Sequence, residues 1–102
     1  MFVFKFEKIK NLKKNLINIE IMKLNEINTQ IKLNNQNLIE LENQKKYLIE
    51  KFDSQIKINI DFNILKYIAD SILSLDVNIK SLQKIIEELR NKKIAQIETI
   101  KN

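Results

Sequence analysis

The sequence predicts an all-α protein in which two long helices pack as an antiparallel coiled-coil hairpin. None of the 102 residues is Gly or Pro, so the chain lacks the residues that most often break helices and form sharp turns. Apolar residues also recur at alternating spacings of three and four over most of the chain. This is the a/d pattern of a helix that lies against a partner helix. We therefore expect one elongated domain over residues 1–102.

The first helix is predicted over residues 4–56 and carries two apolar stripes. The first stripe consists of Ile9, Leu12, Leu16 and Ile19. The step of five residues that follows it breaks the phase and predicts a local change of supercoil. The second stripe then continues at three-and-four spacing and consists of Leu24, Ile27, Ile31, Asn34, Leu38, Leu41, Lys45, Leu48 and Phe52.

A connection is predicted at residues 57–61, with the bend near Asn59. Ile56, Ile58 and Ile60 alternate with polar residues, a period of two that does not fit a helix. Asp61 precedes the next apolar run and is a suitable N-cap, because its carboxylate accepts the free amide hydrogens of a first helical turn. One unbroken helix is the alternative interpretation.

The second helix is predicted over residues 62–101. Its regular seam consists of Leu65, Ile68, Ile72, Leu75, Ile79, Leu82, Ile86 and Leu89. A short connection makes neighbouring helices antiparallel, so residues whose numbers add to about 118 should meet. This register predicts ion pairs of Lys45 with Asp70 or Asp76, and of Lys93 with Glu26.

The two predicted helices differ in length, at about 75–80 Å and about 60 Å. The first fifteen or so residues should therefore extend beyond the second helix. Residues 1–14 carry five lysines against Glu7 alone. Such a basic helix end suits an acidic protein surface, nucleic acid or an anionic membrane, and a solvated end without a target is the alternative.

The composition argues against an enzyme. The chain has no Cys and no His, which excludes the common catalytic triads and His-based or Cys-based metal sites, and without Gly it has no phosphate-binding loop. Neighbouring carboxylates such as Glu87 and Glu88 point to different helix faces and do not converge on one atom. We expect no catalytic residue, cofactor, metal or small-molecule substrate. We also expect no signal peptide at the N-terminus and no membrane span, since no run of eighteen apolar residues occurs.

The opening segment at residues 4–14, Phe-Lys-Phe-Glu-Lys-Ile-Lys-Asn-Leu-Lys-Lys, resembles the flagellar export protein FliJ family. Segments similar to this family also occur at residues 48–52, 65–68 and 75–79, so the resemblance covers essentially the whole chain. It implies a non-enzymatic coiled-coil component of the flagellar type III protein export apparatus. Such a protein is a stalk and adaptor between the export ATPase ring, the export gate and the chaperones that deliver substrates.

The resemblance also implies where partners bind. It places the protein in the cytoplasm, peripherally associated with the inner-membrane export apparatus. We expect no binding of nucleic acid, since the basic end has no arginine and no known groove-reading motif. The contact with the ATPase ring would use Phe4, Lys5, Phe6, Lys8, Lys10, Lys13 and Lys14. The contact with the export gate and chaperones would use Leu41, Tyr47, Leu48, Tyr67, Ser71 and Leu75. The alternatives are a homo-oligomeric coiled-coil scaffold and a basic rod that binds nucleic acid or an anionic membrane.

Overall fold

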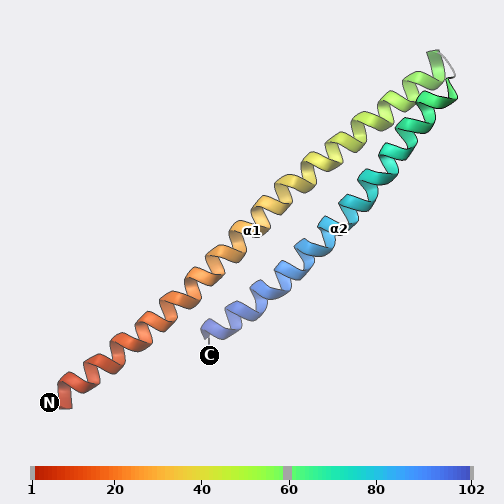
Figure 1. The fold of residues 1–102 in the computed structure, drawn as a ribbon. Coiled ribbons are helices and arrows are strands. Elements are labelled where there is room, and N and C mark those ends of the chain that lie inside the picture. Colours follow the sequence, from red (N-terminus) through yellow and green to blue (C-terminus); the bar gives the residue numbers. More distant parts are fainter. Residues whose placement is uncertain (1, 59–60, 102) are drawn as a thin grey trace. The chain divides into compact units, whose positions relative to one another are not determined.

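A computed structural model describes the backbone of residues 2–58 and 61–101, and side chains from Lys5 onward within these ranges (Figure 1). The chain forms helix α1 at Phe2–Ile58, with 57 residues, and helix α2 at Phe62–Lys101, with 40 residues. No strand is present in the described ranges. The predicted fold class, two long helices that form an antiparallel hairpin, is confirmed.

Helix α1 begins at Phe2 and continues through Ile58, so it extends two residues beyond each of the predicted bounds, residues 4–56. The alternation of Ile56 and Ile58 with polar residues does not interrupt it. Neither residue is a helix breaker, and Lys57 in the last turn interacts favourably with the negative end of the helix dipole. The connection is therefore shorter than residues 57–61, and its predicted centre, Asn59, lies outside the described residues.

Asp61 is the N-cap of α2, as predicted. Its Oδ1 atom accepts a hydrogen bond of 3.0 Å from the backbone N–H of Asn63. Its backbone carbonyl accepts a second bond of 3.0 Å from the N–H of Leu65. The first bond satisfies an amide hydrogen that would otherwise lack a partner in the first helical turn, and the second is the first intrahelical bond of α2. The predicted bounds of the second helix, residues 62–101, are also confirmed.

The chain divides into two compact units, and each contains a segment of both helices. The bend unit comprises Leu33–Glu87, and the terminal unit comprises Met1–Lys32 together with Glu88–Asn102. Within the bend unit the segments of α1 and α2 are antiparallel, and the same holds within the terminal unit (Figure 1).

The core of the bend unit lies along the seam predicted for the second helix. Ile68, Ile79 and Ile86 are buried, with Ile68 only 3% exposed. The remaining seam residues of α2 in this unit are half-buried, and so are the facing α1 positions from Leu38 to Phe52 that follow the predicted stripe. The three-and-four spacing thus identifies the buried face of both helices correctly.

One of the ion pairs predicted from the register, Lys45 with Asp76, is confirmed. Lys45 Nζ lies 2.5 Å from Asp76 Oδ1. Asp70 is exposed, and no ion pair joins Lys93 to Glu26 in the described part of the chain. Asp76 follows the seam residue Leu75 directly and so lies beside the partner helix. Asp70 lies two positions from both Ile68 and Ile72, and Glu26, although it is next to Ile27, is exposed as well, so neither carboxylate is held beside the lysine predicted to pair with it.

Candidate partner-binding surfaces

A hydrogen-bonded cluster joins α1 to α2 near the open end of the terminal unit. The side-chain amide of Gln96 donates hydrogen bonds to the backbone carbonyl of Glu20 at 2.9 Å and to Glu20 Oε2 at 2.5 Å. Glu20 Oε1 also accepts a bond of 3.3 Å from Lys23 Nζ. Glu20 is the first half-buried residue of α1 in the described chain. It therefore marks the point where contact with α2 begins.

The bonds to Glu20 also change its acidity. The hydrogen bond from Gln96, and secondarily the bond from Lys23, lower the pKa of the Glu20 carboxyl below 4.5. Both donors stabilise the ionised form. At neutral pH Glu20 is therefore a charged acceptor that binds the amide of Gln96.

Residues 5–19 of α1 are all exposed, since no described part of the chain covers them. The first apolar stripe lies within this segment, and its members keep about half of their surface in contact with solvent: Ile9 50%, Leu12 60%, Leu16 55% and Ile19 48%. Helical residues at this spacing form one continuous face. The segment thus presents the same kind of apolar face that α2 covers elsewhere on α1. We call residues 5–19 the uncovered segment.

Five lysines lie on the uncovered segment, and three of them, Lys5, Lys8 and Lys13, lie along or beside this apolar face. On the helix, Lys5 lies one turn before Ile9, and Lys8 and Lys13 flank the stripe on opposite sides. Lys5 and Lys8 line a shallow groove with Ile9 and Leu12. A second shallow groove is lined by Glu7, Lys10, Asn11, Lys13, Lys14 and Ile17. None of the five lysines has an ion-pair partner among the described side chains.

The two phenylalanines assigned to the ATPase contact belong to α1. The side chain of Phe6 is 64% exposed. The side chain of Phe4 lies outside the described residues. The structure therefore brings six of the seven residues of this set together on one exposed helical segment, with Phe4 contributing only its helical backbone.

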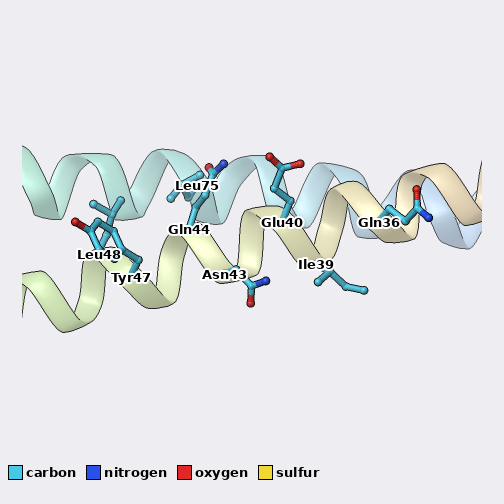
Figure 2. Close-up of a pocket in the computed structure, with 8 residues that line it drawn as sticks. All are labelled: Gln36, Ile39, Glu40, Asn43, Gln44, Tyr47, Leu48 and Leu75. Atoms are coloured by element: carbon cyan, nitrogen blue, oxygen red, sulfur yellow. The ribbon is translucent and has the colours of Figure 1, made fainter.

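A shallow groove in the bend unit collects part of the second predicted set (Figure 2). Tyr47, Leu48 and Leu75 line it. Figure 2 shows Leu48 and Leu75 between the helices, whereas Ile39 and Asn43 point away from α2. The remaining lining residues are Gln36, Glu40 and Gln44, so polar groups border the small apolar floor.

The other members of the second set lie elsewhere. Leu41 is a half-buried seam residue that lines a separate groove with Leu82 and Ile85. Tyr67 is 74% exposed, and its backbone carbonyl accepts a hydrogen bond of 2.9 Å from Ser71 Oγ. Neither Tyr67 nor Ser71 lines the groove of Figure 2. The six predicted residues therefore do not form one surface.

Sequence reasoning missed the Glu20–Gln96 contact, although a signal for it is present. Leu16, Glu20 and Leu24 follow one another at intervals of four, so Glu20 continues the face of both stripes. The spacing from Ile9 to Ile31 fits two eleven-residue repeats, a pattern that needs no break in phase. Reading only apolar residues made the step from Ile19 to Leu24 look like a discontinuity.

Two features are absent from the described residues. Neither helix, over its described residues, has a stretch long and apolar enough to cross a membrane. Within the same residues, no group of three or more carboxylates is arranged to hold a metal ion.

Comparison with known proteins adds no identity: no protein-family model, curated protein or solved structure matches the chain.

Proposed function

We propose that the protein is a non-enzymatic coiled-coil stalk and adaptor that binds other proteins through the uncovered segment of α1. The partner proposed on the basis of the FliJ-like opening segment is the ATPase ring of the flagellar type III export apparatus. Further partners in this proposal are the export gate and the chaperones that deliver substrates. The protein would then be associated with the inner-membrane export apparatus without spanning the membrane.

One observation carries this proposal: an apolar helical face occupies the same exposed segment as five lysines that have no ion-pair partner among the described side chains. Ile9, Leu12 and Leu16 are each at least half exposed. An apolar stripe at heptad spacing is stable when another helix or a groove covers it. Flanking lysines favour a partner with acidic groups beside its apolar surface.

A second copy of the chain fits this segment less well. Two such segments packed face to face in parallel would bring together Lys5, Lys8 and Lys13 of both copies. Like charges in close juxtaposition oppose association, especially at low ionic strength. A homo-oligomeric scaffold therefore remains the second candidate, supported by the apolar stripe but opposed by its charge.

The proposed function is tested by the ATPase activity of a flagellar export ATPase from the same organism. We expect the wild-type chain to bind the ATPase and to increase its rate of hydrolysis. The variant Lys5→Glu/Lys8→Glu/Lys10→Glu should abolish both effects, since it reverses three charges on the uncovered segment. The matched control is Lys46→Glu/Lys51→Glu/Lys84→Glu, which makes the same change at exposed positions of the bend unit. It should behave like the wild type.

The result that contradicts the proposal is equally specific. If the wild-type chain neither binds nor stimulates the ATPase, the stalk function is wrong. Self-association measured by sedimentation equilibrium would then indicate the homo-oligomeric scaffold. Binding to DNA or to anionic vesicles that falls steeply with salt would instead indicate the basic rod.

A further inference from the structure

The α2 seam of the terminal unit is much more polar than the α2 seam of the bend unit. In the terminal unit, the α2 positions that continue the three-and-four spacing after Leu89 include Lys93 and Gln96, both half-buried. In the bend unit, every α2 seam position from Leu65 to Ile86 is apolar. Polar residues at such positions reduce the stability of a coiled coil.

Burial follows the same division. Three of the four buried apolar residues, Ile68, Ile79 and Ile86, belong to the bend unit. The fourth, Leu89, is the second residue of the α2 segment in the terminal unit. Beyond Leu89, no described residue of α2 is buried.

Near its outer end, the terminal unit is joined by hydrogen bonds from the side chain of Gln96. Gln96 donates to two oxygens of Glu20, one on the backbone and one on the carboxylate. Hydrogen bonds to partly exposed groups exchange readily with water, so their net contribution to packing is small compared with buried apolar contacts. The bonds specify one register without making the contact strong.

We propose that the terminal unit opens while the bend unit stays closed. In the open state the α2 segment after Leu89 leaves α1, with the Gln96–Glu20 hydrogen bonds as the reversible latch. Opening extends the exposed apolar face of α1 from the uncovered segment to Leu24, Ile27 and Ile31, which the closed state half-buries. This inference concerns the chain alone and does not depend on the identity of any partner.

Paired spin labels test the opening directly, because the chain has no cysteine and each introduced cysteine is labelled uniquely. The first pair is Thr29→Cys/Asn91→Cys in the terminal unit. The control pair, Asn43→Cys/Val77→Cys, occupies equivalent outward heptad positions in the bend unit. All four sites are exposed. Dilution with excess unlabelled chain ensures that only distances within one molecule are measured.

We expect a single narrow distance distribution for the control pair. The pair in the terminal unit should show a second component, longer by more than about 10 Å, which is one interaxial distance between packed helices. Replacing the polar seam with Lys93→Leu/Gln96→Leu should reduce this component at least about tenfold, since leucine gains from burial at both positions. The matched variant Gln83→Leu/Lys84→Leu, at exposed positions of the bend unit, should leave it unchanged.

Two results would overturn the proposal. One is a distribution for the terminal pair as narrow as that of the control pair. The other is a long component that Lys93→Leu/Gln96→Leu does not reduce. Circular dichroism confirms that each variant remains helical, so that a changed distance reports opening and not the loss of α2.

Discussion

The ammonium group of Lys45 lies 2.5 Å from the carboxylate of Asp76 and joins α1 to α2 within the bend unit. Both side chains keep about a third of their surface exposed, at 33% and 35%. Water therefore screens the pair, and its contribution to stability is under about 1 kcal/mol. The pair specifies which residues of the two helices face each other more than it holds them together.

Lys45→Leu should stabilise the protein. Lys45 occupies a seam position, where leucine buries apolar surface that lysine covers only with its stem. We expect the free energy of unfolding to rise by about 1 kcal/mol, because the gain in burial exceeds the loss of a screened ion pair. Urea denaturation followed by circular dichroism measures the change. The control Lys46→Leu, at an exposed site, should have little effect, and a lower midpoint for Lys45→Leu would contradict the packing.

Ile68→Ala should cause a large loss of stability. Ile68 is 3% exposed and is the most buried of the four core residues. Removing most of its side chain should lower the free energy of unfolding by about 2–4 kcal/mol, from lost transfer energy and the cavity that remains. Leu73→Ala is the matched control on the same helix, since Leu73 is 63% exposed and should change stability by less than about 0.5 kcal/mol. Equal effects would mean that the seam is assigned to the wrong face.

Asp61→Ala should weaken the start of α2. The substitution removes the acceptor for the Asn63 amide, and loss of an N-cap costs about 1 kcal/mol. Asp61→Asn should retain most of the stability, because asparagine caps helices about as well as aspartate. Thermal unfolding gives the melting temperatures of the wild type, Asp61→Ala and Asp61→Asn. Identical melting temperatures for wild type and Asp61→Ala would show that the cap is unimportant.

The stability of the wild-type protein should depend on pH through Glu20. The pKa of this carboxyl is lowered in the folded state, chiefly by the hydrogen bond from Gln96. A lowered folded pKa contributes stability that is fully present above the unfolded pKa, near the ordinary value of 4.5, and is lost as pH falls through the folded value. The contribution is therefore present at neutral pH and disappears in acid below about pH 4.5.

The variants Glu20→Gln and Gln96→Ala identify the source of this pH dependence. Glu20→Gln removes the carboxylate, and Gln96→Ala removes the principal cause of its lowered pKa. In each variant the melting temperature should therefore depend less steeply on pH below about 5. The measurement is a series of thermal transitions between about pH 3 and about pH 7. If both variants lose stability in acid as steeply as the wild type, other carboxylates are responsible.

The sequence was sufficient to predict the fold because few alternatives fit it. The regular seam from Leu65 to Leu89 and the absence of Gly and Pro are compatible with few folds other than packed helices. Asp61 clearly marks the start of the second helix. The end of α1 was harder to predict. The end of a helix depends on a few weak local preferences. The alternation with a period of two around Ile58 predicted a break, but neither Ile56 nor Ile58 is a helix breaker, so the helix continues.

The surfaces were predicted less completely than the fold. The lysines around Ile9 were identified because the sequence shows both the charge of this segment and the greater length of the first helix, which leaves the segment without a facing helix. The Glu20–Gln96 contact joins residues 76 positions apart, and its existence depends on the register of one helix against the other. Spacing along each helix fixes which face is buried, but a shift by one heptad changes which polar residues meet.

The charge of the uncovered segment has a practical consequence for handling the protein. At physiological ionic strength the screening length is about 8 Å, so the lysines of neighbouring molecules still repel one another. At about 1 M salt it shrinks to about 3 Å, while attraction between the exposed isoleucines and leucines persists. Concentrated salt, which often keeps basic proteins dispersed, should here cause the molecules to cluster through their N-terminal helices.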